Sequence, residues 1–514
     1  MAGQRQQWSS KWTVIFAAVS SAVGLGNIWR FPFTAYDNGG GAFIIPYLIA
    51  VFILGVPLMI LEFAYGSKFR GATPLSFARA GKKFEFVGWI PTVCAALIIF
   101  YYGIILVWAL NFAVYSFTMP WTAYTSPSVF FNETYLGRTG SALDFGSIRW
   151  PILIGLFVLW IPTYFVLSKD LKKGLERVNS VVLPLMLLFA ILLIIRGATL
   201  EGAALGLNTF FTPDFNAITD GTVWLAAFGQ AMFSLSLAMG IMVTYGSYMK
   251  KKTELVNTTY IVAILDVLFA FLFSVGIFAI LGYMATSMGT TIEEIPYSLA
   301  GAGLVFITLP VALYYMGTFG YVVGVGFFLM LAVTGWTSFL SLMEAFVAPF
   351  IEKFGVTRKK MYQIMCIVGF VCSLVYATGA GQIVLGMVDY TVNTFGLPLV
   401  GLLQALVAGW FIKGAMPMFR DHINQNSMRF FKAGMFWTAC VKFVIPIFLI
   451  VTVIRVLWMI IVDGFVPPAL GIGGEWRTAP ELIVYVGGSI ATTAAVAILF
   501  PRIKWKTPVD KIEG

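Results

Sequence analysis

Histidine is almost absent from this sequence, since His422 is the only one among 514 residues. The chain therefore lacks the commonest metal ligand and the commonest general base of proteins. Cysteine is scarce as well, and none of Cys94, Cys366, Cys372 and Cys440 stands in a CxxC or Cys/His cluster. These absences argue against a metalloenzyme, a zinc site and a disulfide framework.

Charge is also scarce, because 11% of the residues are charged and 59% are hydrophobic, far from the composition of a soluble domain. The longest apolar stretches approach the ~20 residues that cross a bilayer; they include 42–63, 92–117, 151–167, 181–195 and 443–462. About twelve spans begin near residues 13, 42, 88, 150, 178, 222, 257, 320, 360, 383, 439 and 481. The sequence predicts an all-α integral membrane protein, with residues 1–514 as a single transmembrane domain.

The few positive charges are unevenly distributed. Lys and Arg gather in the alternate loops 68–83, 169–177, 250–252, 353–360 and 413–432 and in the tail after residue 501. By the positive-inside rule these loops and both termini are cytoplasmic. The net charge of +10 is thus a topology signal and does not indicate a nucleic-acid partner. We expect a multi-pass protein in contact with lipid in the plasma membrane, or in the inner membrane of a bacterium.

The opposite loops, near 118–149, 197–221 and 285–318, contain almost no lysine and are expected to face outside. The loop 285–318 contains a further apolar stretch that is too interrupted for a span. It is either a lid of short helices over the outer mouth or a plain surface loop.

Two predicted spans contain residues that weaken a helix. Gly24, Gly26 and Asn27 lie in the first span, and Ser236 and Gly240 lie in the sixth. Glycine costs a helix interior ~1 kcal/mol, and unwound backbone in a membrane must find polar partners. Interrupted helices at matching positions of two halves predict a midplane site where amides attract an anion and carbonyls hold a cation. The alternative is that these small residues only allow close helix packing.

The motif from Gly24 to Pro32, followed by 38–43 and 46–47, is similar to the signature of the neurotransmitter:sodium symporters. Tyr101 with Tyr102, the stretch 230–248, and Thr337 with Ser338 extend the resemblance, which is strongest to the bacterial amino-acid branch. It implies a core of 5+5 helices in an inverted repeat, with spans 1 and 6 unwound. The repeats would be 13–196 and 222–413, with two accessory helices in 439–501.

The resemblance also implies the binding residues. The first sodium site would use the Ala22 carbonyl, the substrate carboxylate, and Asn27, Ser234 and Asp266. The second would use the carbonyls of Ser20, Val23 and Thr334 and the hydroxyls of Thr337 and Ser338. Independently, oxygen ligands with little net charge suit an alkali cation that must leave again. The substrate would meet Ala22, Leu25, Gly26, Ile98, Tyr102, Phe233, Ser234, Ser236, Met239, Ser338 and Leu342.

Two gates follow from the same resemblance. On the outside, Arg30 and Asp389 would close over the site together with Tyr102 and Phe233. Arg5 and Trp8 would latch the inside onto Tyr248, Glu344 and Glu352. The alternative is ordinary anchoring of charged residues at the ends of spans.

Three positions refine the expected substrate and ions. Gly24 stands where monoamine carriers of the family have aspartate, which favours a substrate with its own carboxylate. Asp266 stands where chloride-dependent members usually have asparagine, next to the region where their chloride binds. Tyr47, Gln230 and Ser234 still match that region, while Ala270 replaces a further polar ligand. A carboxylate at 266 would supply the negative charge that chloride supplies elsewhere. Ala238 stands where bacterial relatives commonly have glycine, and its methyl group could trim the pocket.

The sequence therefore predicts a sodium-coupled, chloride-independent symporter for a small hydrophobic amino acid, working by alternating access. It predicts no enzyme and no cofactor, only two Na⁺ ions as cargo. The working unit is a monomer or a homodimer. The rival functions are a carrier of an osmolyte such as taurine, betaine or a γ-amino acid, and a substrate sensor or channel.

Overall fold

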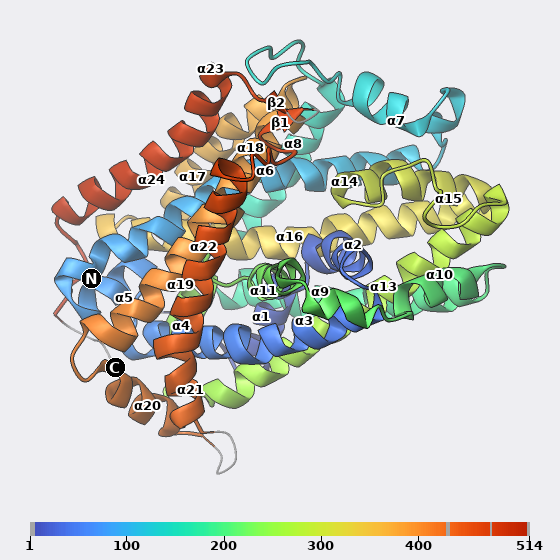
Figure 1. The fold of residues 1–514 in the computed structure, drawn as a ribbon. Coiled ribbons are helices and arrows are strands. Elements are labelled where there is room, and N and C mark those ends of the chain that lie inside the picture. The colour runs from blue at the N-terminus through green and yellow to red at the C-terminus, as the bar shows by residue number, and fades with distance from the viewer. Residues whose placement is uncertain (1–5, 428–431, 473–474, 511–514) are drawn as a thin grey trace.

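Membrane-length helices dominate the computed structural model, which describes residues 6–427, 432–472 and 475–510 (Figure 1). Ten helices in these residues are long and apolar enough to cross a membrane, and Lys11–Ala22 with Gly26–Asp37 forms one further span bent by 50°. Gly221–Ser234 and Ile241–Ser247 lie where the sixth span is predicted. The predicted all-α membrane fold with broken first and sixth spans is confirmed. The division into repeats at 13–196 and 222–413 stays a prediction.

The first half of the chain contains the bent span and four continuous ones, with η marking a 3₁₀- or π-helical segment. Its elements are α1 (Lys11–Ala22), η1 (Gly26–Arg30), α2 (Phe31–Asp37), η2 (Gly41–Phe43), α3 (Ile44–Ala50), η3 (Val51–Gly55), α4 (Val56–Phe69), α5 (Thr73–Ala80), η4 (Lys82–Phe84), α6 (Glu85–Tyr115), η5 (Pro120–Ala123), α7 (Pro127–Val129), η6 (Phe130–Tyr135), α8 (Trp150–Leu167), η7 (Lys172–Glu176), α9 (Arg177–Ala198) and α10 (Ala203–Phe211).

The next part of the chain contains the second broken span and four continuous ones. Its elements are η8 (Phe215–Thr219), α11 (Gly221–Ser234), α12 (Ile241–Ser247), α13 (Leu255–Met288), α14 (Gly301–Gly303), η9 (Leu304–Thr308), α15 (Leu309–Tyr315), α16 (Thr318–Phe354), α17 (Arg358–Ser373), η10 (Leu374–Ala377), α18 (Gly381–Thr391), η11 (Val392–Gly396), α19 (Leu397–Leu406), η12 (Val407–Phe411) and α20 (Ala415–Asn424). The loop 285–318 thus does contain short helices, α14 and α15.

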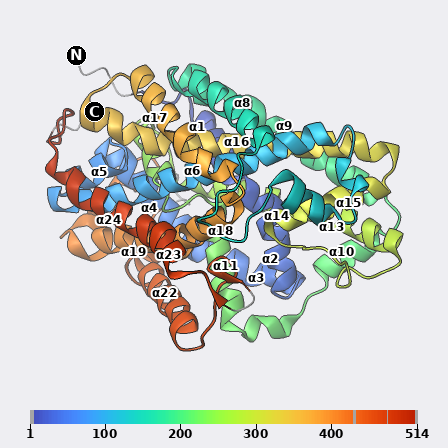
Figure 2. The same cartoon turned by 90° about the horizontal axis from the view of Figure 1, so that it is seen from above.

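The last two spans lie on the outside of the bundle, as the two views show (Figures 1 and 2). Few of their side chains are buried inside the protein, as expected for helices that face lipid. Between them lie two short antiparallel strands of two residues each. The elements are α21 (Met435–Ala439), η13 (Cys440–Val444), α22 (Ile445–Ile461), β1 (Gly471–Ile472), β2 (Glu475–Trp476), α23 (Ala479–Glu481), η14 (Leu482–Gly487), α24 (Gly488–Leu499) and η15 (Phe500–Arg502).

Proline explains five of the π-helical segments. Segments η1, η3, η9, η11 and η13 each end two residues before a proline, and the residue between donates its amide to a carbonyl five residues back. Proline has no amide hydrogen, and its ring collides with the carbonyl four residues back. Widening the preceding turn to the π geometry gives that carbonyl room without ending the helix. These spans therefore continue through their prolines.

The basic loops and both ends of the described chain gather at one end of the bundle. The Trp8 amide donates to the Tyr248 carbonyl at 3.0 Å, and the Lys506 amide donates to the Lys353 carbonyl at 3.0 Å. The Arg358 guanidinium donates to the carbonyls of Leu167, the last residue of α8, and Lys169 in the following loop. This clustering is what the expected cytoplasmic placement of these loops requires.

Candidate functional site

The two helix breaks face each other across a cavity near the middle of the bundle. All eleven residues predicted to bind substrate line this cavity, together with Ser21, Gly24 and Ile241. The cavity is narrow, with a volume of about 30 Å³. An amino acid therefore enters only if the lining helices or side chains move apart, as they must in a carrier that closes around its cargo.

Local backbone geometry explains why the sixth span breaks. Ser236 and Ala238 have φ values of 52° and 63°, and Gly240 has 76°, all in the left-handed region that interrupts a helix. The Ala238 amide, released from helical bonding, donates at 2.8 Å to the carboxylate of the buried Glu62 on α4. Ala238 itself is not among the residues that line the cavity. Its methyl group therefore does not trim the pocket.

Glycines in the first span make room for the second broken span and for α16. A Cβ atom at Gly26 would lie 3.0 Å from the Phe233 ring. A Cβ atom at Gly24 would lie 2.8 Å from the Ser338 hydroxyl oxygen and 3.3 Å from that of Tyr102. A side chain such as aspartate therefore has no space at position 24 unless Ser338 moves.

A first cluster of oxygen atoms lies beside the cavity, where η1, α11 and α13 meet. The Asn27 amide nitrogen Nδ2 donates to Ser234 Oγ at 3.2 Å, to the Asp266 carbonyl at 3.1 Å and to Asp266 Oδ1 at 2.8 Å. Ser234 Oγ donates to Asp266 Oδ2 at 2.7 Å. Three oxygens thus surround one positively polarised group, the side-chain nitrogen of Asn27. Asn27 Oδ1 accepts a hydrogen bond from the Gly24 amide at 3.2 Å, so both ends of this side-chain amide are held. A hard cation that displaced the amide nitrogen would meet oxygen atoms from α11 and α13, the ligand type that it prefers.

A second oxygen cluster joins the end of α1 to α16. Thr337 Oγ1 donates to the carbonyls of Ser20 at 2.9 Å and Thr334 at 2.8 Å. Ser338 Oγ donates to the Ser21 carbonyl at 3.0 Å and to that of Ser20 at 3.4 Å. Val23 follows the last residue of α1, and its extended ψ of 101° turns its carbonyl away from the helix axis. Four residues predicted to bind the second sodium ion therefore lie together, from two different helices: Ser20, Thr334, Thr337 and Ser338.

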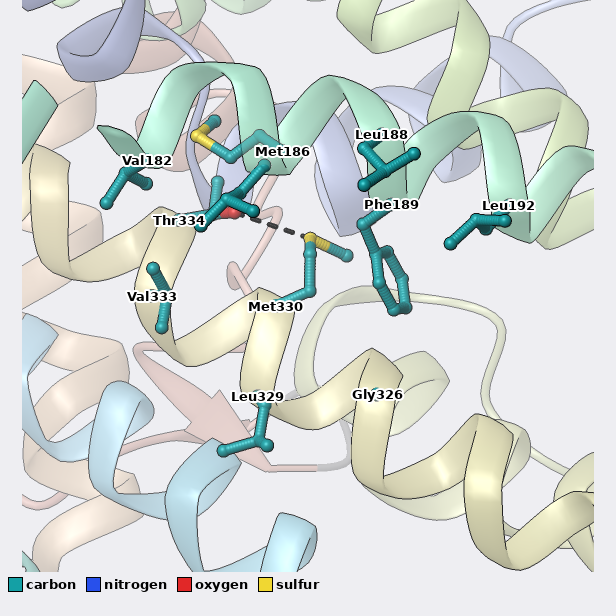
Figure 3. A pocket seen from close by; sticks show the side chains of 11 residues that line it. Val182, Met186, Leu188, Phe189, Leu192, Gly326, Leu329, Met330, Val333 and Thr334 are labelled. Carbon is teal, nitrogen blue, oxygen red and sulfur yellow. Dashed lines mark hydrogen bonds between the residues drawn. The ribbon is translucent and has the colours of Figure 1, made fainter. Parts of the chain in front are cut away.

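The hydroxyl of Thr334 faces away from this cluster. It bonds to the Met330 sulfur at 3.3 Å, beside a groove between α9 and α16 (Figure 3). The groove has a volume of about 270 Å³, and its lining, which includes Met186, Phe189 and Leu329, is almost entirely apolar. Only the carbonyl of Thr334 is thus placed to act as an ion ligand.

The region expected to hold chloride in other members is also buried here. Within the described residues, neither the Tyr47 hydroxyl nor Gln230 Oε1 forms a hydrogen bond. Ala270 is fully buried and adds no polar atom. The fully buried Asp266 carboxylate borders this region through its contact with Ser234.

The two charged residues predicted to form the outer gate, Arg30 and Asp389, contact different partners near the cavity. The Arg30 guanidinium lies 4.7 Å from the centroid of the Phe233 ring, which lines the cavity. Asp389 Oδ1 accepts hydrogen bonds from Tyr101 at 2.6 Å and Asn393 at 2.7 Å. In the described part of the chain, Arg30 and Asp389 form no direct ion pair.

At the inner end, Trp8 packs against α12. Its ring lies edge-on to Tyr245 with centroids 5.2 Å apart, and its Nε1 donates to the Tyr245 carbonyl at 3.1 Å. Tyr248 in turn donates to Glu344 at 2.8 Å. The Glu352 carboxylate accepts hydrogen bonds from the Ala72 amide at 3.0 and 3.1 Å. Arg5, the predicted latch residue, lies outside the described residues.

Two residues of this inner network have no counterpart among the predicted gate residues. Arg358 holds both oxygens of the buried Glu344 at 2.8 and 2.6 Å, and Tyr362 also donates to that carboxylate. Both residues lie on α17, after the turn that follows α16. Because a turn separates α17 from the helix of Glu344, helix periodicity does not predict that these side chains meet. In the sequence, Arg358 is recognisable only as one of several basic residues in the loop 353–360.

Comparison with known proteins agrees with this arrangement. The sequence matches the Sodium:neurotransmitter symporter family over residues 5–135 and 122–486. It is 36% identical over 446 residues to an uncharacterised sodium-dependent transporter of Methanocaldococcus jannaschii, covering 87% of this chain and 89% of that protein. It is 30% identical over 459 residues to the sodium- and chloride-dependent GABA transporter 2 of Rattus norvegicus, covering 82% and 75%.

A solved structure extends the likeness to three dimensions. The fold matches the crystal structure of MhsT in complex with L-phenylalanine with a TM-score of 0.73 and 30% sequence identity, over 88% of this chain and 99% of that one. The chain is therefore a member of the sodium:neurotransmitter symporter family, a multi-pass, sodium-dependent membrane transporter and not an enzyme.

Proposed function

We propose that this chain takes up a hydrophobic amino acid together with two sodium ions and without chloride, from the outside of the cell to the cytoplasm. The observation that carries the proposal is the cavity between two helix breaks with an oxygen cluster on either side. The amides that begin η1 suit a carboxylate, and the two clusters suit alkali cations.

The lining of the cavity supports a hydrophobic side chain. Ile98, Met239, Ile241 and Leu342 surround the space that the substrate side chain would occupy. The complex of MhsT with L-phenylalanine supports the same class of substrate. Without a carboxylate at position 24, a free amine has no counter-charge in the cavity, whereas an amino acid brings its own.

Coupling to two ions makes uptake electrogenic, because a zwitterion moves with two positive charges. Each charge that crosses 100 mV supplies about 2.3 kcal/mol, and each tenfold sodium gradient about 1.4 kcal/mol per ion. Two ions together supply roughly 7 kcal/mol, enough for an accumulation on the order of 10⁵-fold.

The coupling is tested by adding a labelled amino acid to the outside of proteoliposomes and measuring its uptake. We expect uptake to stop when choline replaces sodium, and to increase when a potassium diffusion potential makes the interior negative. Uptake that continues in choline or potassium at fixed pH contradicts sodium coupling.

A γ-amino acid is the second candidate substrate, because relatives include a GABA transporter. Counterflow with a panel of labelled hydrophobic amino acids, GABA, taurine and betaine separates the two classes. Exchange of a hydrophobic amino acid alone supports the first candidate. Exchange of GABA or an osmolyte supports the second, and exchange of none of them favours a sensor.

Chloride independence is proposed on the basis of Asp266. Its fixed negative charge lies beside the first oxygen cluster and would offset the repulsion between two sodium ions. Replacing chloride with gluconate should leave wild-type uptake unchanged, whereas Asp266→Asn should lose chloride-free uptake. The double variant D266N/A270S is the matched test of whether added chloride restores activity. If gluconate abolishes wild-type uptake, the proposal is wrong.

A further inference from the structure

A second, basic pocket lies at the end of the bundle where the Lys- and Arg-rich loops gather. The end of α4, the loop after α12 and helix α20 meet there, and α20 packs against α4. The pocket has a volume of about 350 Å³. We call it the basic pocket; its lining residues are Ser67, Lys68, Arg70, Lys250, Lys251, Thr253, Leu255, His422, Gln425 and Asn426.

Four positive side chains line the basic pocket, and no carboxylate does. The neighbouring Glu254 is already bound, because Lys11 donates to it at 2.7 Å and Asn257 at 3.2 Å. Asp421 is exposed on α20 and does not line the pocket. Like charges held close together repel one another, so an anion seated among them would be strongly attracted.

The positive groups come from separate elements and are partly fixed in place. Lys250 donates to the Ser9 carbonyl at 2.5 Å, and Arg70 donates to the Met249 carbonyl. Lys68 lies in the last turn of α4, and Lys251 follows α12. An anion with several oxygens spread around one centre could meet charges from these different directions at once, which a planar carboxylate does less well.

The uncharged polar residues that line the basic pocket also suit an anion with several oxygen atoms. Ser67, Thr253, Gln425 and Asn426 can each donate a hydrogen bond. His422 Nε2 lies 2.9 Å from Ser67 Oγ. Burial, together with the nearby Lys68 and Arg70, lowers the pKa of His422 to about 4, so its ring is neutral at physiological pH.

We propose that the basic pocket binds a phosphate group, carried either by an anionic phospholipid or by a soluble phosphate. The end of the span Gly41–Phe69 marks the edge of the membrane, so a lipid headgroup can reach Lys68. The pocket lies away from the substrate cavity and shares no lining residue with it. A bound phosphate would tie together the ends of α4 and α12 and helix α20.

The single histidine provides the probe for this site. We would label His422 with ¹³C and ¹⁵N in the full chain, purified in a neutral detergent with a histidine-free tag, and titrate it with inorganic phosphate at neutral pH. We expect a saturable change in its resonance, and a higher measured pKa of His422 once an anion offsets Lys68 and Arg70. The variant K68Q/K251Q should weaken phosphate binding about tenfold or more, because two charge-assisted contacts are lost.

The matched control is K359Q/K360Q, which removes the same charge from two exposed residues of α17 outside the pocket. It should leave phosphate affinity within about twofold, because separated surface charges are screened. An equal loss of affinity in this control shows general surface attraction and overturns the proposal. If K68Q/K251Q lowers the thermal unfolding temperature, K251Q alone, at an exposed site, replaces it.

A second arm separates the two sources of phosphate. The labelled chain is placed in nanodiscs of phosphatidylcholine with or without phosphatidylglycerol. A His422 response to phosphatidylglycerol but not to free phosphate assigns the pocket to a lipid headgroup, and the reverse assigns it to a soluble phosphate. A His422 resonance that responds to neither rules the site out.

Discussion

At the scale of single residues, two threonines one turn apart on α16 have opposite roles. Thr337 Oγ1 lies in the second oxygen cluster, whereas Thr334 Oγ1 faces Met330 and the apolar groove (Figure 3). Only the carbonyl of Thr334 points to the proposed ion, and no side-chain substitution removes it. The orientation of one hydroxyl therefore decides which substitution affects sodium binding.

We expect Thr337→Val to weaken sodium activation of uptake about tenfold or more, because a methyl group replaces one ion ligand. Thr334→Val is the control, because it makes the same substitution one turn away on the same helix. It should change the sodium activation of uptake by less than about twofold. The measurement is the sodium concentration for half-maximal uptake in proteoliposomes. An equal effect of both substitutions would place the ion elsewhere.

His422 gives a second prediction at this scale. Its folded pKa of about 4 lies below the ordinary value of 6.5, so between these values the unfolded chain binds a proton that the folded chain does not. The folded state therefore loses stability as the pH falls through this window. Well above pH 6.5 the ring is neutral in both states and contributes no pH dependence.

The thermal unfolding temperature of the wild type in detergent should thus fall between about pH 7 and about pH 5 by more than that of His422→Gln. The partial exposure of the ring limits the difference to about 1 kcal/mol. Comparison with the variant cancels the contribution of the carboxylates that titrate in the same range. Parallel pH profiles for the two proteins would show that His422 titrates normally in the folded state.

At the scale of helical elements, the break in the sixth span borders the substrate cavity and contains a residue with a strained backbone conformation. Ala238 has a left-handed φ of 63°, which costs a residue with a Cβ atom about 1 kcal/mol relative to glycine. Its amide is held by Glu62, so the strained conformation is maintained by a neighbouring helix and not by the residue itself.

Ala238→Gly should therefore stabilise the protein by up to about 1 kcal/mol without changing the cavity, which residue 238 does not line. The reciprocal Gly240→Ala should destabilise it by more, because φ is 76° and the new Cβ atom would lie 2.8 Å from Thr73 Oγ1. Thermal unfolding in detergent measures both. If Ala238→Gly lowers the unfolding temperature, the break does not carry the strain that we assign to it.

At the scale of the whole molecule, the inner network joins three separate parts of the chain. Glu344 on α16 receives Arg358 and Tyr362 from α17 and Tyr248 from the end of α12, where Trp8 also packs. Opening a path from the cavity to the basic end of the bundle would require α12 to separate from α16. The hydrogen bond from Tyr248 to Glu344 crosses this boundary, and Arg358 holds the Glu344 carboxylate in place to accept it. Because a buried carboxylate needs such partners, the network favours the closed arrangement.

We expect Glu344→Gln to open the inner end and raise the rate at which a thiol reagent labels Thr244→Cys on α12 about fivefold or more. Arg358→Gln should act similarly, and the double variant should add little, because both singles remove the same interaction. A background with Cys372→Ala removes the one native cysteine that is not buried. Additive effects of the two substitutions would show that the pair does not act as one latch.

Much of the architecture could be predicted from the sequence because its causes are local. A bilayer sets the length of apolar runs, so the spans appear as long hydrophobic segments such as Gly41–Phe69. Glycines and hydroxyl residues mark both broken helices, and loop lysines gather at one end of the bundle. The five π-helical turns before prolines also have a local cause, because proline disturbs the hydrogen bonding only of the helix that contains it.

Contacts between distant segments could not be predicted from the sequence. It carries no signal that pairs Glu344 with Arg358, turns Thr334 away from the ion cluster or brings His422 to Lys68 and Lys251. Likewise, Ala238 lies in the broken span yet bonds outward to Glu62 and leaves the pocket untouched. Helix periodicity and span length describe single elements, whereas these contacts depend on the rotation and register with which packed helices meet, and only the tertiary structure determines those.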